Sequence, residues 1–324
     1  MKNLFRASPK TVAALSLGIL LALWIGWKCI APTSAEVQSP PPPAPRTIAD
    51  PRIVSLSPAI TETVYLLGLG GHLAGRTFQC DFPDDVTNVP IALVSTEQKP
   101  AELAEAIAAL RPAYVLMPDS MVDSPLHNEL AARKISHLGI KAGTPTDLYQ
   151  SVFELAERFD ETDRATAWCA QIDVLSSALR ERIETDCTRV GRTPAVLLVV
   201  GRMKDGLAVA GSQSFHQGLF DALGIRNACL DPAPWKILTD REVAALRPDI
   251  ILEARPGASD EDIVRAATDW TKAPESPAVR TGDVHILTEP WILRSGPRID
   301  DFLRTVALHV HTWSSRSTPA PAQP

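Results

Sequence analysis

The middle of the chain carries a long, uninterrupted helical pattern. Residues 163–188 contain neither Pro nor Gly, and most of them are good helix formers. Apolar residues recur along this segment at steps of three to five positions: Ala167, Ile172, Leu175, Leu179 and Ile183. This spacing predicts one helical face that packs against other elements. A helix of this length would extend over roughly 39 Å, which is longer than the usual globular helix.

Two similar phrases flank this predicted helix. Residues 108–116 read AALRPAYVL, and residues 244–252 read AALRPDIIL. A second echo is the sequence Leu-Gly after a helical pattern, at Gly68 in the first half and at Gly224 in the second. The chain is therefore predicted to contain two similar halves joined by one rigid helix.

Short apolar runs alternate with helical patterns in both halves. In the first half, the predicted strands occupy residues 53–57, 73–77, 90–94, 114–117 and 137–141. In the second half, they occupy residues 195–200, 250–253 and 284–288. Such alternation is typical of a parallel sheet with helices on both faces. We therefore predict an α/β fold in which two parallel-sheet lobes, residues 52–160 and 191–313, are bridged by one long backbone helix over residues 161–190.

Both ends of the chain are predicted to lie outside this fold. Basic residues precede an uncharged run over residues 11–27, which is typical of a signal peptide or an N-terminal membrane anchor over residues 1–35. The pattern leaves cleaved and anchored forms open, and both place the protein in the periplasm, in the second case tethered to the inner membrane. Residues 36–51 are Pro-rich and predict a stiff linker, and residues 314–324 predict a disordered tail.

Composition removes several classes of function. The formal net charge of -6 and the lack of a basic cluster with interleaved aromatic residues argue against a nucleic-acid binder. Five cysteines show no CxxC spacing, and the histidines form no HExxH, so no metal site is predicted. No P-loop, nucleotide-binding glycine motif or nucleophile elbow is present, so the chain is predicted to be no enzyme, with no catalytic residue and no cofactor. Whether the cysteines form a disulfide stays open, since export permits one.

Ligands of open parallel sheets bind beyond the carboxyl ends of the strands. Most candidate ligand-binding residues lie at or just after the ends of the predicted strands; Trp235, in a loop, and Arg294, in a late segment, are added to them. The full set is Phe78, Gln79, Met117, Arg202, Trp235, Trp291 and Arg294. Aromatic walls with a few cationic or amide groups suit a bulky organic ligand with peripheral hydrogen-bond acceptors. The alternative for each tryptophan is that it packs the core or fills a gap between elements.

The order of several sequence blocks resembles a known family. The blocks are RIVSLSPAITETVYLLGLGGHLAGRT (52–77), CDFPDDVTNVP (80–90), EAIAALRPAYVL (105–116), AGSQSFHQGLFDALGIRNA (210–228), WKILTDREVAALRPDIIL (235–252), AVRTGDVHIL (278–287) and SGPRIDDFL (295–303). They resemble the helical-backbone (class III) periplasmic binding proteins, which serve ABC importers of vitamin B12, iron siderophores and haem. The CDFP block and the loop with Trp235 are most similar to the cobalamin-binding branch, in which the corresponding Trp helps to wall the corrin.

The resemblance implies binding without chemistry. The expected ligand is a cobalamin or another corrinoid, and the expected partner is the membrane permease of an ABC importer. The chain itself is expected to be a monomer. Members of the family dock onto the permease through one acidic residue on each lobe, and Glu105 matches that position in the first lobe. In the second lobe Arg241 stands at the matching position and the acid is displaced to Glu242. This departure leaves two-point docking open.

Two alternatives remain for the function. One is a ferric-siderophore or haem receptor of the same fold, although haem would favour a His or Tyr ligand after these strands. The other is a membrane-anchored sensor that is not coupled to transport, which Arg241 and the Pro-rich spacer favour. In each case one rigid helix between the lobes predicts a small closure on ligand binding rather than a wide hinge motion.

Overall fold

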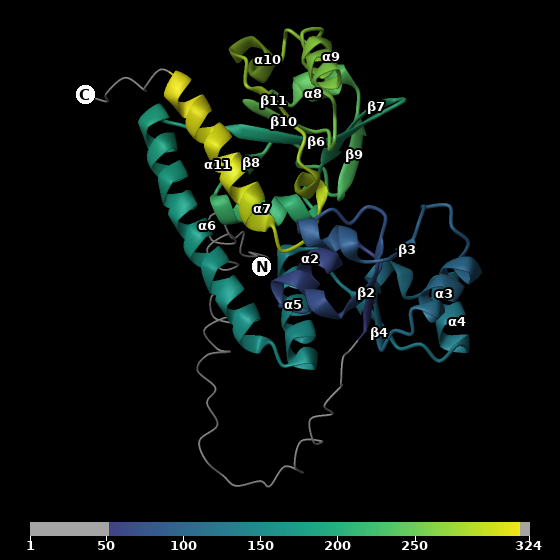
Figure 1. Cartoon of the computed structure of the whole chain (residues 1–324). Coiled ribbons are helices and arrows are strands. Elements are labelled where there is room, and N and C mark those ends of the chain that lie inside the picture. The colour runs from purple at the N-terminus through teal and green to yellow at the C-terminus, as the bar shows by residue number, and fades with distance from the viewer. Residues whose placement is uncertain (1–51, 318–324) are drawn as a thin grey trace, which may run out of the picture. The chain divides into compact units, whose positions relative to one another are not determined.

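The computed structural model describes residues 52–317 (Figure 1). The predicted signal peptide or anchor and the Pro-rich linker lie outside the described residues, as does most of the predicted tail. Within residues 52–317, no helix combines the length and the apolar character needed to cross a bilayer. The cysteines of this part of the chain, Cys80, Cys169, Cys187 and Cys229, are all free thiols.

The first lobe is built on a five-stranded parallel sheet in the order β3-β2-β1-β4-β5. Its strands are β1 (Ile53–Ser55), β2 (Leu73–Thr77), β3 (Ile91–Leu93), β4 (Tyr114–Pro118) and β5 (His137–Ile140). The connecting helices are α2 (Pro58–Leu66), α3 (Pro100–Ala109), α4 (Pro125–Ala132) and α5 (Pro145–Phe159). Each of these helices has Pro in its first turn, where the missing N–H costs nothing and the fixed φ favours helix.

The second lobe contains a six-stranded sheet with the main order β11-β10-β6-β7-β9, and β8 pairs with β6. Its strands are β6 (Ala195–Met203), β7 (Gly206–Ala210), β8 (Arg226–Asn227), β9 (Trp235–Leu238), β10 (Ile250–Ala254) and β11 (Val284–Leu287). Its shorter helices are α7 (Phe215–Leu223), α8 (Asp240–Ala245), α9 (Asp260–Trp270) and α10 (Pro277–Thr281).

This second sheet is mixed, which refines the prediction of a purely parallel one. Strand β6 continues past the predicted end at Val200 to Met203, and the chain then reverses so that β7 runs antiparallel to β6. Gly206 begins β7 with a φ of +148°, and a Cβ there would lie 2.4 Å from the carbonyl oxygen of Leu238. Glycine is therefore required at this turn by both its backbone conformation and the neighbouring strand.

The predicted backbone helix is present as α6 (Thr162–Val190), which runs along both lobes in Figure 1 and ends at Gly191 in the left-handed conformation. It packs against α5 and against the last helix, α11 (Ile299–Arg316). Its buried apolar face consists of Ala165, Trp168, Ile172, Ile183, Cys187 and Val190. The two lobes and the long bridging helix confirm the predicted fold class. Helix α11 extends to Arg316, so the predicted tail begins later than residue 314.

One hydrophobic core is shared by the two lobes. It includes Ile53 and Leu116 of the first sheet, Leu198 and Leu252 of the second, and Trp168 of α6. The indole N–H of Trp168 also donates to the carbonyl oxygen of Pro297 at 3.2 Å, which ties the bridging helix to the second lobe. Two smaller clusters of buried residues belong to one lobe each. Continuous packing of this kind resists large relative motion of the lobes, because close-packed interiors deform little.

Candidate functional site

A pocket of about 270 Å³ lies where the first sheet meets a segment of the second lobe. Ser57 and Ala59 line it from the amino end of α2, and Pro118 lines it from the carboxyl end of β4. Leu293, the last residue of the 3₁₀ helix η4 (Pro290–Leu293), and Arg294, which follows it, close the pocket from the other lobe. Its position beyond the carboxyl ends of parallel strands is the one at which such sheets bind ligands.

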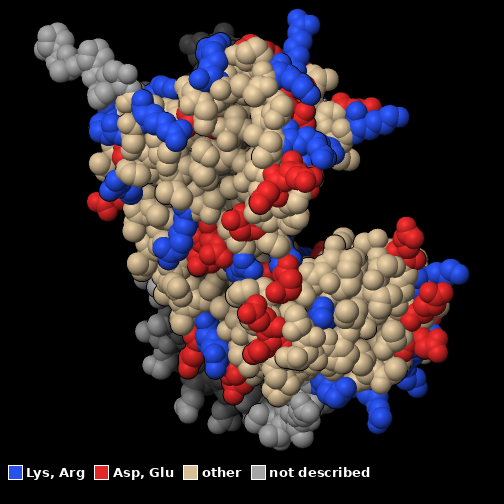
Figure 2. Space-filling model, turned by 45° about the horizontal axis from the view of Figure 1, so that its top comes forward, with Lys and Arg blue, Asp and Glu red and all other residues tan. Residues whose placement is uncertain are grey.

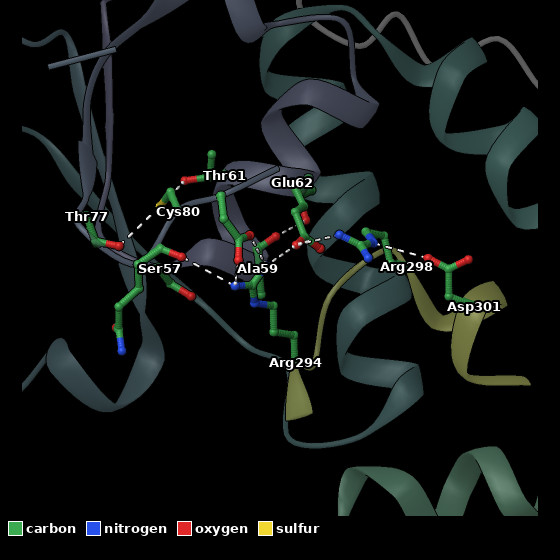
Figure 3. A network of polar contacts seen from close by, with 12 residues as sticks. Ser57, Ala59, Thr61, Glu62, Thr77, Cys80, Arg294, Arg298 and Asp301 are labelled. Atoms are coloured by element: carbon green, nitrogen blue, oxygen red, sulfur yellow. Dashed lines mark hydrogen bonds and ion pairs between the residues drawn. The ribbon is translucent and has the colours of Figure 1, made fainter. Parts of the chain in front are cut away.

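Arg294 bridges the two lobes at this pocket (Figure 3). Its Nη1 donates to Glu62 Oε1 at 2.8 Å and to Asp81 Oδ1 at 2.6 Å, and its Nη2 donates to Asp81 Oδ2 at 2.8 Å and to the carbonyl oxygen of Gln79 at 3.3 Å. The guanidinium is thus occupied by two carboxylates of the first lobe, in the forked geometry that makes such pairs strong.

Glu62 is the buried partner in this bridge. It lies on α2, is 3 % exposed, and has its Oε2 buried without a hydrogen-bond partner within the described structure. Burial raises the pKa of Glu62 above its usual range, and the hydrogen bond from Arg294 and the charge of Arg298 only partly offset this. Asp81 behaves in the opposite way, because the hydrogen bonds from Arg294 lower the pKa of that carboxyl.

The loop that carries Asp81 is held from within by a buried arginine, Arg76 on β2. Its Nη1 donates to the carbonyl oxygens of Thr77 and Cys80 at 3.1 Å, and its Nε donates to that of Val89 at 3.0 Å. The Cys80 thiol is also buried, within 3.2 Å of the Thr61 hydroxyl and 3.1 Å of the Thr77 hydroxyl (Figure 3). Our prediction of site residues missed Arg76, although a charged residue in the apolar strand LAGRT was a usable signal.

Large apolar side chains are exposed beside this bridge. Phe78 and Phe82, in the loop after β2, are 42 % and 43 % exposed, and the guanidinium of Arg298 lies 4.3 Å from the ring centre of Phe82. Trp235, at the start of the edge strand β9, is 47 % exposed. Its ring centre lies 5.8 Å from that of His216, whose Nε2 is 2.9 Å from the carbonyl oxygen of Ile292, one residue before the pocket. The two lobes are separated by a notch that opens to the right in Figure 2.

The other predicted ligand-binding residues are placed differently. Met117 is fully buried in the core of the first lobe, so the prediction that it contacts ligand is wrong; inside β4 its side chain points into the sheet packing rather than past the strand end. Gln79 meets Arg294 through its main-chain oxygen. Trp291 is half-buried and packs against the shared core.

Arg202 is occupied by its own lobe. Its Nε and Nη2 donate to the two oxygens of the fully buried Glu253 at 2.8 and 2.9 Å, and its guanidinium lies 5.3 Å from the ring centre of Trp270. Although burial opposes ionisation of Glu253, hydrogen bonds from Arg202, Arg255 and Trp270 lower its pKa. Arg202 is therefore held within the second lobe, and a ligand would have to compete with Glu253 for it.

The two predicted docking acids occupy exposed sites. Glu105 lies on the solvent side of α3. Glu242 lies in the first turn of α8, where its carboxylate accepts hydrogen bonds from the backbone N–H and the hydroxyl of Thr239, both at 2.8 Å. This capping box lowers the pKa of Glu242 and ties it to its own helix.

The chain belongs to the periplasmic binding protein family, because the sequence model of that family matches residues 53–290. It is 24 % identical over 80 % of its length to an uncharacterised ABC transporter substrate-binding lipoprotein, YvrC, of Bacillus subtilis, of which it covers 80 %. It is 23 % identical over 80 % of its length to the vitamin B12-binding protein of Vibrio parahaemolyticus, of which it covers 88 %. A periplasmic heme-binding protein of Pseudomonas aeruginosa superposes with a TM-score of 0.70 at 22 % identity, over 84 % of this chain and 95 % of that one.

Membership of this family confirms that the chain is a binding protein rather than an enzyme. The solved structure has under a quarter of its residues in common with this chain, so its likeness concerns the fold. Among residues 52–317, no group of three or more His, Cys, Asp or Glu side chains could hold a metal ion.

Proposed function

We propose that this chain is the exported substrate-binding component of an ABC importer and that it binds a corrinoid of the vitamin B12 class in the notch between its lobes. Three of its relatives are vitamin B12-binding proteins, at 23 % to 26 % identity over three quarters or more of this chain. The observation that supports this choice of ligand is that the arginine at the pocket, Arg294, is already paired with Glu62 and Asp81.

A ligand with free carboxylates, such as haem, needs unpaired cations or an axial ligand. Arg294 and Arg202 each hold carboxylates of the protein already, and the residues that line the pocket include no His, Tyr, Cys or Met. His216, whose ring lies beside that of Trp235, is buried, and burial lowers its pKa to about 4, so it stays neutral with its Nε2 against the carbonyl oxygen of Ile292. A corrinoid, which presents amide groups around a broad apolar ring, is better matched to Phe78, Phe82 and Trp235.

The pocket volume implies how the ligand is seated. About 270 Å³ is below the usual range for drug-sized ligands, and a corrinoid is larger still. The ligand would therefore lie in the notch beyond Arg294, with one edge at the pocket and its faces against the exposed aromatic rings. Because the lobes share one core, we expect local movement of the 78–82 loop rather than wide opening.

We further propose that the lobes present Glu105 and Glu242 to the permease of the importer. Glu105 is free to pair with a basic residue of the partner, whereas Glu242 would have to exchange its bonds to Thr239 or share them. Docking would accordingly depend more on Glu105 than on Glu242. Replacing Glu105 would therefore slow transport more than replacing Glu242.

Thermal unfolding of the full-length chain tests the ligand. Cyanocobalamin, cobinamide, haemin and a ferric hydroxamate siderophore are each added in excess, since a ligand bound only by the native state raises the midpoint. We expect a shift with the two corrinoids alone, and Trp235→Ala to weaken their binding by about thirtyfold without changing the midpoint of the free protein. Phe153→Leu, in α5, is a control for a general effect of losing an aromatic ring.

Other outcomes would redirect the proposal. A shift with haemin or the siderophore alone would retain the binding protein and reject the corrinoid. No shift with any of the four would favour a sensor with a different ligand, and an unchanged affinity in the Trp235→Ala variant would remove that ring from the binding site.

A further inference from the structure

A second pocket, of about 1000 Å³, lies in the second lobe away from the bridge formed by Arg294. It is formed where α6, α8, α10 and α11 end and where β6, β8, β10 and β11 begin, so it is at the opposite edge of the sheet from the notch. Five arginines line it: Arg192, Arg226, Arg247, Arg280 and Arg316. We call it the arginine pocket.

The arginine pocket is positively charged in a negatively charged chain. Its lining contains five arginines and two aspartates, whereas the chain as a whole has a formal net charge of -6. Asp249 accepts a hydrogen bond from Arg192 at 2.7 Å, and Asp283 accepts one from Arg316 at 3.2 Å. Both aspartates are buried, while the side chains of their arginine partners are 52 % and 55 % exposed. The aspartates therefore fix two of the arginines in place and still leave their outer N–H groups toward solvent.

The remaining three arginines have no acidic partner within residues 52–317. The side chain of Arg280 donates only a long hydrogen bond of 3.5 Å to the carbonyl oxygen of Glu275, and the side chains of Arg226 and Arg247 make no hydrogen bond or ion pair within these residues. All three are exposed at the surface of the lobe. Like charges held around one hollow repel each other, so the folded chain would be stabilised by an anion that enters it.

Helix ends alone do not account for this cluster. Cations are favourable near the carboxyl ends of helices because they lie against unpaired carbonyl groups. In the described structure, none of the side-chain hydrogen bonds from these five arginines goes to the terminal carbonyls of a helix; they go to Asp249, to Asp283 and to Glu275. Arg189, outside the lining, does make such a bond, to the carbonyl oxygen of Ser314 near the end of α11.

Three apolar residues also line the pocket. Val190, Leu246 and Trp313 contribute to it, and Arg192 lies over the Trp313 ring at 4.7 Å from its centre. Planar guanidinium groups bind phosphate oxygens in pairs, and several of them around one hollow favour an anion with more than one charge. We propose that the arginine pocket binds a phosphate-bearing anion. Headgroups of an anionic membrane surface and free phosphate compounds share this chemistry.

Binding assays on the full-length chain test the proposal in two arms. The first arm measures the unfolding midpoint and calorimetric binding with inorganic phosphate and with tripolyphosphate. The second measures co-sedimentation with phosphatidylcholine vesicles that either contain or lack phosphatidylglycerol. The test variant is Arg226→Gln/Arg247→Gln/Arg280→Gln, which removes three charges from the pocket. The matched control, Arg111→Gln/Arg133→Gln/Arg158→Gln, removes three exposed charges from the first lobe.

We expect tripolyphosphate to bind the wild type and the control alike, and the test variant at least about tenfold more weakly. Binding should also weaken as salt rises, because exposed charges are screened. A variant with Lys at the same three positions keeps the charge and should recover part of the affinity. Binding only to free phosphates identifies a soluble compound as the ligand, and binding only to vesicles with phosphatidylglycerol identifies a membrane headgroup.

Two results would overturn the proposal. One is equal affinity of the wild type and the test variant, and the other is no binding in either arm at low salt. The corrinoid titration serves as the check on folding, because the arginine pocket and the notch share no residues. A test variant that still binds the importer ligand is folded, and failure of the ligand assignment for the notch leaves the anion assay unaffected.

Discussion

The pocket at the notch and the arginine pocket use arginine in opposite ways. At the notch, Arg294 is mostly buried, with a side chain that is 14 % exposed, and it is held by two carboxylates of the other lobe. In the arginine pocket, Arg226 and Arg247 are exposed and pair with no described acid. A buried pair is costly to break because the remaining charge is stranded, whereas an exposed cation contributes little to stability. The first arrangement therefore serves the fold, and the second is available to a ligand.

Replacing Arg294 should give the largest effect on stability. In Arg294→Met, Glu62 keeps only Arg298, at 3.8 Å, as a nearby cation, and the bridge to Asp81 is lost. We expect a loss of about 3 kcal/mol in the free energy of unfolding, measured by urea denaturation. Arg226→Met, in the arginine pocket, is the matched control and should change stability by less than about 0.5 kcal/mol. Equal losses in the two variants would contradict the distinction between the pockets.

A smaller loss of stability should follow from adding one methyl group at a contact between the lobes. Gly218 of α7 lies against Pro145 at the start of α5, and a Cβ at Gly218 would be 2.7 Å from the Pro145 Cδ. Gly218→Ala should cost about 1 to 2 kcal/mol, since overpacking outweighs the gain in helix propensity. Gly71→Ala meets no atom within 4 Å and serves as the control. Binding of tripolyphosphate should be unchanged, because this contact lies between the lobes; a parallel loss of anion binding would argue that the two pockets are coupled.

The smallest effect is expected for the pH dependence of stability that Glu62, the buried partner of Arg294, contributes. The pKa of Glu62 is raised in the folded protein, so its contribution to stability is fully present below the unfolded value near 4.5 and is lost as pH rises through the folded value. Gln does not titrate, so the stability of Glu62→Gln should increase relative to that of the wild type as pH rises from 4 to 7.

Asp81 provides a control of opposite sign. Its pKa is lowered, so its contribution is present above the unfolded value near 3.8 and is lost as pH falls through the folded value. The advantage of the wild type over Asp81→Asn should therefore shrink in acid. Chemical denaturation at several pH values measures both trends, and the same trend in both variants would rule out the assignment of the two carboxyl groups.

Much of the fold was predictable from local patterns. Helices such as α3 and α5 begin at Pro and carry one apolar face, and the long helix has neither Pro nor Gly before Gly191, so periodicity and end signals agreed. Strand β9 was missed because three of its four positions are exposed and Lys236 interrupts its apolar residues. Strand β7 was missed although its residues, Gly206–Ala210, are apolar and none of them is exposed. Antiparallel pairing of β7 with β6, and of β9 with β7, places both strands in the sheet.

The site was less predictable, since side-chain direction and pairing depend on tertiary contacts. Arg294 was a candidate from a late segment of the sequence, but its carboxylate partners Glu62 and Asp81 come from distant parts of the chain. Met117 was placed at the site because it ends an apolar run, yet β4 continues to Pro118 and buries it. The arginine pocket left no motif, because its members are scattered from residue 192 to residue 316 and only the ends of several helices bring them together.

The shared core also bears on when the chain can fold during its synthesis and export. Residues of the last helix, including Phe302, Val306 and Trp313, complete a core that begins with Ile53 of the first strand. A growing or partly translocated chain that lacks α11 leaves α6 uncovered along the face that the two helices share. Stable packing of both lobes must therefore wait until the carboxyl end of the chain is available, so the last helix sets the earliest point at which the whole fold can form.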